Sequence, residues 1–364
     1  MRGVVPIHVW LLAIAIALAG CTSRLPTPQS PNQPGTKHAL DARLGGAAPR
    51  ASKDDPDPAP FTSPSCAAPR VPGTSVEVGQ VAAETPGLRC CTYLRRSATK
   101  PRALPVARIA FVQSGTGIYS VADGSVGPVA THALESDDAA LLTLDKPGVA
   151  ADPQGALLFD REAYRQYTLA DLVTCAQKAL GWAFSRDSVD PHAGLTLHGH
   201  SEGGQVMLRM LASSSRLDEA HRVTHTIVSG LLLEPFASAM DRQIAIFMPF
   251  EIEAFHEALA QHDDDYLLQH ALSSRYLEHP TARQDLTEVL SELSVRRPRW
   301  RVEVYQGERD TNAPLSLVKS FEEKNEKARS SGRPSLDLRV HVYPRARHYL
   351  DQRFDSDVRA LLSK

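Results

Sequence analysis

The 364-residue sequence has little net charge, because 40 lysines and arginines are balanced by 42 aspartates and glutamates. It contains no basic stripe of the kind that binds nucleic acid and no long run of like charges that would form an interaction tail. It has no internal repeat, and its five cysteines lack metal-ligand spacing. These absences argue against a nucleic-acid-binding protein, a repeat protein and a cysteine metal site.

The sequence also lacks an apolar run of the roughly 20 residues needed to span a bilayer. The run at residues 9–19 is shorter, follows a basic start at Arg2 and ends in Leu-Ala-Gly-Cys at residues 18–21. Such a segment is typical of an export signal. Its end resembles the lipobox of bacterial lipoproteins, which implies removal of residues 1–20 and acylation of Cys21. Thr22 implies the outer membrane in a Gram-negative cell. An ordinary secretory signal near a cysteine is the alternative.

Residues 21–72 are rich in proline and polar residues and show no hydrophobic period. Such a segment cannot bury a core, and its prolines make it a stiff spacer. We expect it to hold the following domain away from the membrane. Residues 73–364 suit one domain with an insertion.

The remaining cysteines can form disulfides if the chain is exported. Cys66 can pair with Cys90 or Cys91, since all three lie near the start of the domain. Cys90 and Cys91 are adjacent and point to opposite faces if their segment is a strand. Cys175 falls on the apolar side of a predicted helix at residues 168–183, and we interpret it as a buried thiol.

The stretch at residues 195–204 predicts a strand, a tight Gly-x-Ser-x-Gly turn and then a helix. A serine at the tip of such a turn sits in strained backbone, and the crowding beside it explains Gly199 and Gly203. The turn aims the free N–H groups of the next helix at the oxygen of Ser201. A structural glycine-rich turn is the alternative, but the strand and helix patterns on either side argue against it.

This stretch resembles the nucleophile elbow of the α/β-hydrolases. The resemblance implies an α/β fold with a mostly parallel central sheet flanked by helices. We expect strands and helices in the ranges that follow. The strands are 75–81, 88–94, 107–112, 140–144, 194–198, 223–233, 301–305 and 336–343, and the helices are 159–183 and 315–330.

A second landmark of the resemblance follows the strand at residues 107–112. α/β-Hydrolases place there a His-Gly loop whose backbone N–H completes the oxyanion hole, and this chain has Ser114-Gly115 instead. Because the donor is a backbone group, the missing histidine leaves the role open to Thr116 N–H, or else to Gly115 N–H, alongside Glu202 N–H. Residues 145–149 also resemble the Asp-x-x-Gly loop that many of these proteins carry after their fourth strand.

The expected catalytic acid lies after the strand at residues 301–305. Gly307, Asp310 and Pro314 match the Gly-x-x-Asp-x-x-x-Pro loop of this family, so the resemblance assigns the acid to Asp310. Glu308 and Glu234 are the alternatives, and an Asp that merely caps the next helix is a third interpretation.

The expected catalytic histidine is His348, which follows the last predicted strand. The glycine that usually precedes it is missing. His341 lies within the strand and is interpreted as a packed or surface residue. The chain order Ser201, Asp310, His348 is that of the α/β-hydrolases.

Residues 236–297 change character and become helical, with apolar residues interspersed with charge. An insertion at this position resembles the helical cap that covers the active site of many α/β-hydrolases; the alternative is that the helices only cover edges of the sheet. The run His-Asp-Asp-Asp at residues 262–265 is interpreted as a solvated turn, since its contiguous carboxylates lack spaced metal ligands.

The residue types at these positions predict covalent serine catalysis. The serine attacks an acyl carbon, the histidine moves the proton and the aspartate orients the histidine. We expect hydrolysis of a carboxylic ester, with thioesters and amides or peptides as alternatives on the same triad. A surface lipoprotein that keeps the fold only for binding is an alternative of another class. The expected partners are a small acyl substrate and, through Cys21, a membrane of the cell envelope. We expect no cofactor and no metal, and the oligomeric state stays open.

Overall fold

The computed structural model describes residues 65–98, 105–124, 126–214, 223–350 and 352–363. The predicted signal peptide, Cys21 and most of the predicted linker lie outside the described residues. Residues 61–364 form one compact unit, and the fold below is that of this unit. Within the described ranges, no helix combines the length and apolar character needed to cross a bilayer.

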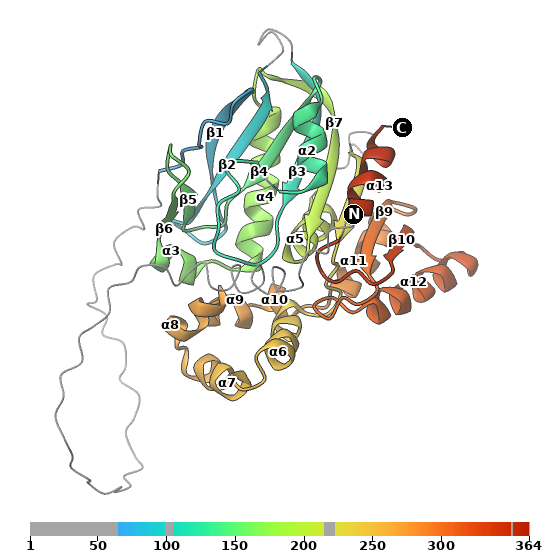
Figure 1. The fold of residues 1–364 in the computed structure, drawn as a ribbon. Coiled ribbons are helices and arrows are strands. Elements are labelled where there is room, and N and C mark those ends of the chain that lie inside the picture. Colours follow the sequence, from blue (N-terminus) through green and yellow to red (C-terminus); the bar gives the residue numbers. More distant parts are fainter. Residues whose placement is uncertain (1–64, 99–104, 125, 215–222, 351, 364) are drawn as a thin grey trace, which may run out of the picture. The chain divides into compact units, whose positions relative to one another are not determined.

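Eight strands form the central sheet (Figure 1). They are β1 (Thr74–Ala82), β2 (Arg89–Ser97), β3 (Val106–Gln113), β4 (Ala139–Leu144), β7 (Val189–His200), β8 (Val223–Ser229), β9 (Arg301–Gly307) and β10 (Asp337–Tyr343). Their order is β1-β2-β4-β3-β7-β8-β9-β10. Only β2 runs antiparallel to its neighbours, so the predicted mostly parallel sheet is confirmed.

Side-chain alternation along the strands divides the core between the two faces of the sheet. In β3, Ile109 and Phe111 pack into the larger cluster with α4 (Leu169–Phe184) and α5 (Glu202–Ser213). The opposite face of β3 packs against α2 (Pro128–Glu135) and α13 (Gln352–Leu362). α12 (Leu315–Ser330) contacts β10 and has the bounds expected from the sequence.

The helix expected at residues 159–183 is wrong, because the chain forms two helices there. α3 (Arg161–Gln166) ends before Tyr167, and α4 begins after Thr168. The Thr168 hydroxyl accepts from Asp171 N–H, while the Asp171 carboxylate accepts from Thr168 N–H. This capping box satisfies the free N–H groups of a helix start, so it begins a new helix rather than continuing the old one. A small hairpin, β5 (Val149–Ala151) and β6 (Leu157–Phe159), precedes α3 and was not predicted.

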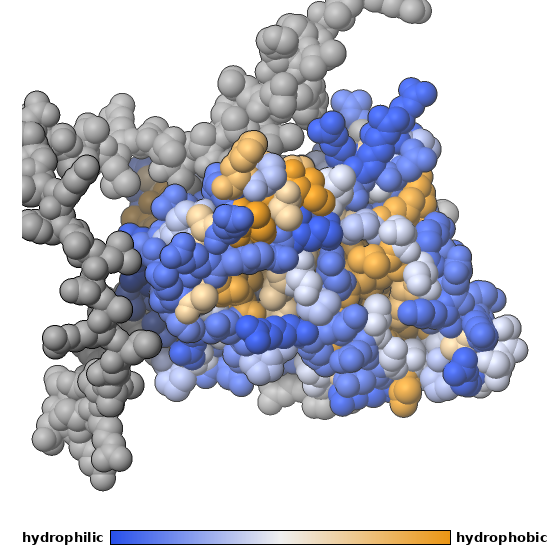
Figure 2. Space-filling view, turned by 90° about the horizontal axis from the view of Figure 1, so that it is seen from below, coloured by the Kyte–Doolittle hydropathy of each residue, from blue (hydrophilic) through white to orange (hydrophobic). Residues whose placement is uncertain are grey.

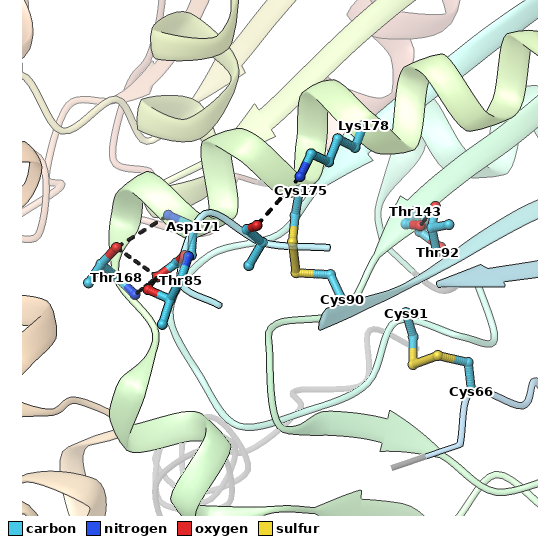
Figure 3. The surroundings of a disulfide bond; sticks show 11 residues. Cys66, Thr85, Cys90, Cys91, Thr92, Thr143, Thr168, Asp171, Cys175 and Lys178 are labelled. Carbon is cyan, nitrogen blue, oxygen red and sulfur yellow. Dashed lines mark hydrogen bonds between the residues drawn. A yellow bond between two sulfur atoms is a disulfide. The ribbon is translucent and has the colours of Figure 1, made fainter. Parts of the chain in front are cut away.

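Two disulfides fasten the start of the domain (Figure 3). Cys91 bonds to Cys66, one of the two pairings expected, and Cys90 bonds to Cys175, so the interpretation of Cys175 as a free thiol is wrong. The adjacent cysteines point to opposite faces of β2, as a strand requires. Cys90 therefore faces α4, where the Cα atom of Cys175 lies 6.2 Å away. The 85 residues between the two hide this contact in the sequence.

The predicted helical insertion lies between β8 and β9. It comprises α6 (Phe236–Phe247), α7 (Ile252–Gln261), α8 (Asp264–Leu267), the 3₁₀ helix η2 (Leu268–His270), α9 (Ser274–Glu278), α10 (Pro280–Arg283) and α11 (Leu286–Arg296). Helices α6–α10 gather at one end of the sheet, and α11 returns to lie against α5 (Figure 1). A view of this end shows apolar groups exposed among polar ones (Figure 2).

The acidic run at residues 262–265 spans the short connection between α7 and α8 and the first two residues of α8. Asp263 caps α8, Asp264 accepts from Ser274 N–H, and Asp265 pairs with Arg161 and Arg165. In the part of the chain that the structure describes, no three metal-binding side chains come together.

Candidate active site

Ser201 lies at the sharp turn between β7 and α5. Its φ of 54° is in the left-handed region, which costs a residue with a side chain about 1–3 kcal/mol at such a site. The two flanking positions have no room for a side chain. A Cβ atom on Gly199 would lie 2.4 Å from Gly203 O, and one on Gly203 would lie 2.1 Å from Gln113 O. The turn is further held by a hydrogen bond from Ser201 N–H to Ser229 O.

Asp310 lies in the loop between β9 and α12, where its side chain is fully buried. One carboxylate oxygen accepts from Asn312 N–H and Ala313 N–H, both at 2.9 Å. The other accepts from Gln306 Nε2 at 2.8 Å and pairs with His348 Nδ1 at 2.9 Å. Four hydrogen-bond partners therefore fix the orientation of the carboxylate. Sequence reasoning missed Gln306, although its place at the end of β9, next to the Gly-x-x-Asp loop, was a signal.

His348 lies in the loop between β10 and α13, and its ring is mostly buried. Two glycines on neighbouring strand ends make room for this loop. A Cβ atom on Gly307 would lie 2.3 Å from Arg347 O, and one on Gly230 would lie 2.7 Å from His348 Cε1. The sequence lacks a glycine before His348, and Gly230 and Gly307 instead provide the room for this loop. Gly230 has a φ of 58°, which also ends β8 four residues earlier than predicted.

The pairing of His348 with Asp310 determines the role left to the other ring nitrogen. Because a carboxylate accepts, Nδ1 carries the hydrogen and Nε2 is free to accept a proton. The Ser201 hydroxyl and the His348 ring do not form a hydrogen bond in this structure. Such bonds are often long before substrate binds. The structure therefore brings Ser201, Asp310 and His348 to neighbouring loops at the carboxyl ends of β7, β9 and β10.

The two alternative acids have other partners. Glu308 is exposed and accepts from Arg345 N–H, while Glu234 pairs with Arg242 of α6. Arg242 also donates to Asn312 O at 2.6 Å, so the helical insertion contacts the loop that carries Asp310. His341 stacks on Tyr305 and hydrogen-bonds Glu303, which confirms it as a packed residue.

His200, the residue before the nucleophile, is a neighbour that sequence reasoning missed. Its ring centroid lies 4.8 Å from that of His348, and its Nδ1 lies 3.1 Å from Ser229 Oγ. Burial holds the pKa of His200 well below its usual value, so the ring stays neutral and adds no positive charge beside His348. The exposed ring of Tyr349 covers its other side.

The expected oxyanion loop passes directly beside Ser201. A Cβ atom on Gly115 would lie 3.2 Å from Ser201 Cβ, and Thr116 is the next residue. Glu202 is the first residue of α5, whose opening N–H groups have no acceptor within the helix. Gly115 of the loop after β3 therefore lies close to Ser201, with Thr116 next to it in the chain, and Glu202 directly follows Ser201.

The loop after β4 binds Ser120 and Val121, which follow the expected oxyanion loop in the chain. The buried carboxylate of Asp145 accepts from Ser120 Oγ and Val121 N–H, both at 2.7 Å, and from Tyr93 OH at 2.8 Å. Burial raises the pKa of Asp145 to about 6. The resemblance of residues 145–149 to a family loop therefore coincides with a structural contact to the site.

The sequence matches no protein-family model and no curated protein sequence. A protein from Bacteroides ovatus named as a candidate dipeptidyl aminopeptidase IV has a similar structure, with 14% identity and a TM-score of 0.51; the match covers 80% of this chain and 36% of that one. DcsB, solved with a substrate analogue, matches 79% of this chain and 98% of its own at 13% identity, with a TM-score of 0.51.

An acetyl xylan esterase from Paenibacillus sp. R4 has 14% identity and a TM-score of 0.49, with 80% of this chain and 85% of that chain covered. At these identities the likeness bears on the fold and not on the substrate. Together with the strand order and the turn at Ser201, the likeness to the Bacteroides ovatus protein and to DcsB, each with a TM-score of 0.51, shows that this chain has the α/β-hydrolase fold.

Proposed function

We propose that this protein is a serine hydrolase that cleaves a carboxylic ester through an acyl-serine intermediate. The observation that carries the proposal is the buried pair of Asp310 and His348, 2.9 Å apart, beside a serine at a left-handed turn. If the turn at Ser201 had only a structural role, that role would not explain why a buried carboxylate orients a histidine next to it.

The proposal assigns a group of this chain to each step. His348 Nε2 takes the proton of Ser201 as Oγ attacks the acyl carbon, and Asp310 stabilises the imidazolium that results. The N–H groups of Glu202 and of Thr116 or Gly115 stabilise the oxyanion. His348 then gives the proton to the leaving alcohol. Water activated by the same histidine releases the acid.

Thioesters and amides pass through the same tetrahedral intermediate, so the substrate class needs a direct test. The purified protein, with its disulfides intact, is assayed against matched p-nitrophenyl esters, acyl thioesters and aminoacyl p-nitroanilides. The proposal predicts the highest kcat/KM for an ester, with activity lost in Ser201→Ala. A higher kcat/KM for a thioester or an anilide would assign the triad to that class instead.

We further propose that the protein is tethered to the cell envelope through an acylated Cys21. The support is the sequence of residues 1–21, followed by a spacer rich in proline. Metabolic labelling with an alkyne palmitate analogue tests it. The parent is expected to carry the label and fractionate with membranes, and Cys21→Ser to lose both properties. An unlabelled parent in the soluble fraction would contradict the tether.

A further inference from the structure

The side chain of Glu202 lies at the junction of three elements, directly after the nucleophile. One carboxylate oxygen accepts from Lys146 Nζ at 2.6 Å, in the loop after β4, and the other accepts from the hydroxyl of Tyr276 in α9. The Glu202 and Lys146 side chains are only 1% and 4% exposed. Burial raises the pKa of Tyr276 well above its usual value, so its hydroxyl remains a hydrogen-bond donor.

Stability alone does not explain this arrangement. Removing two charges from water costs several kcal/mol per ion, and well-packed apolar residues of similar volume are often as stable as a buried ion pair. A buried pair of this kind supplies a fixed geometry more readily than it supplies free energy of folding.

The geometry it fixes is that of the elbow. Left-handed backbone at Ser201 persists only where the surroundings hold it. On one side, Ser201 N–H bonds Ser229 O, and Ser201 O accepts from Gly204 N–H. On the other, the next residue is fastened through its carboxylate to Lys146 and Tyr276. The N–H of that same residue is an expected oxyanion donor.

Lys146 also follows Asp145, which binds the segment just after the expected oxyanion loop. Asp145 accepts from Ser120 and Val121, while Lys146 donates to Glu202 of the elbow. This dipeptide thus contacts both the segment after β3 and the start of α5, and the hydroxyl of Tyr276 adds a contact from the helical insertion.

We propose that Lys146 and Tyr276 are positioning residues: they hold the Glu202 carboxylate and thereby the oxyanion-donating N–H at the start of α5. This inference rests on the proposed serine-hydrolase function. It makes the helical insertion part of the oxyanion hole's support and not only a cover.

The test compares Tyr276→Phe and Lys146→Met with the parent on the preferred ester. Tyr343→Phe is the matched control, because it removes a tyrosine hydroxyl that bonds a carboxylate, Asp357, on the opposite face of the sheet. We measure kcat, KM and the affinity for a boronic acid, which forms a tetrahedral adduct on the nucleophile. Thermal unfolding of each variant is recorded in parallel.

Tyr276→Phe and Lys146→Met are expected to lower kcat about tenfold or more, below the 10²–10³-fold loss of a whole oxyanion donor. Boronate affinity should fall with kcat while KM stays near that of the parent, because the lost contact acts on the transition state. The double variant should lose less than the product of the single losses, since both residues act through one carboxylate.

The inference is overturned if folded Tyr276→Phe keeps the parent's kcat and boronate affinity, or if Tyr343→Phe loses as much. Tyr276→Phe removes one oxygen atom, so it keeps the test decisive even where Lys146→Met does not fold. A parent that neither turns over esters nor reacts with a fluorophosphonate overturns the proposed function itself. An active parent with unaffected variants overturns only the positioning role.

Discussion

At Gly230, the backbone and the ring of His348 leave no room for a side chain. A Cβ atom at this position would lie 2.7 Å from His348 Cε1. The backbone φ of 58° is also one that residues with a side chain rarely adopt. Gly230→Ala should displace the ring and lower kcat by roughly 10- to 100-fold, since misplacing a catalytic group by 1 Å costs about that much.

The matched control for this prediction is Gly332→Ala. Its φ is 71°, but nothing lies within 4 Å of the position of its Cβ atom. It should lose a similar free energy to backbone strain, measured by urea unfolding, and keep the parent's kcat. Equal kcat values for the two variants would contradict the account of Gly230.

The identity of the catalytic acid is tested at Asp310. Asp310→Asn keeps the side-chain shape but reverses the hydrogen bond to His348 Nδ1, and a change of this kind lowers kcat by about 10⁴-fold in a serine triad. Glu308→Gln and Glu234→Gln should keep most of the activity, because their carboxylates have other partners. Loss of activity in either of these, with Asp310→Asn still active, would move the acid to that position.

The residues to which we assign the chemistry are visible in the sequence because each has a local motif. Ser201 has its glycines, Asp310 its Gly-x-x-Asp-x-x-x-Pro loop, and His348 its place after the last strand. Gln306, His200 and Gly230 act through contacts between neighbouring strand ends. Such contacts depend on strand order, which a single sequence does not specify locally.

Among the elements, the two disulfides differ in the chain they enclose. The cysteines of the Cys90–Cys175 bond are 85 residues apart, and those of Cys66–Cys91 are 25 apart. In the chain-entropy model the longer loop stabilises by about 1 kcal/mol more. Cys90→Ala with Cys175→Ala should therefore lose more free energy of unfolding than Cys66→Ala with Cys91→Ala. Urea unfolding measures both, and a larger loss for the second pair would contradict the model.

The elements that were misjudged show two kinds of error. The break between α3 and α4 was readable, because Thr168 and Asp171 are spaced as a capping box; the continuous apolar periodicity concealed it. The Cys90–Cys175 bond was not readable, because it depends on α4 packing on the face of β2 to which Cys90 points. Most strand ranges were close, since buried parallel strands are apolar along their length. However, β7 begins five residues earlier and β8 ends four residues earlier than predicted.

For the molecule as a whole, Asp145 makes stability depend on pH. Its pKa rises from 3.8 to about 6 on folding, chiefly through burial. The folded state binds this proton more tightly than the unfolded chain does. Asp145 therefore contributes free energy of unfolding that is fully present below the pKa of the unfolded chain. This contribution, of the order of 3 kcal/mol, is lost as the pH rises through about 6.

Asp145→Asn removes this titration. The free energy of unfolding of the variant relative to the parent should rise between about pH 4 and pH 7, as followed by urea unfolding at several pH values. A difference that does not change with pH would contradict the burial of an ionisable carboxyl group at this position.

The fold class was predictable because one motif, in the correct context, implied an architecture and the order of its remaining landmarks along the chain. The substrate was not, since it depends on how the helical insertion is placed relative to the site. That placement depends on contacts between distant segments, such as Tyr276 with Glu202 and Arg242 with Asn312.

The most direct test of the account is reaction of the folded protein with a fluorophosphonate probe, beside Ser201→Ala and the exposed control Ser331→Ala. The account predicts labelling of the parent and of Ser331→Ala, and none of Ser201→Ala, with circular dichroism confirming that all three are folded. A folded parent that is not labelled, or a Ser201→Ala variant labelled as strongly as the parent, would contradict an activated serine at the β7–α5 turn.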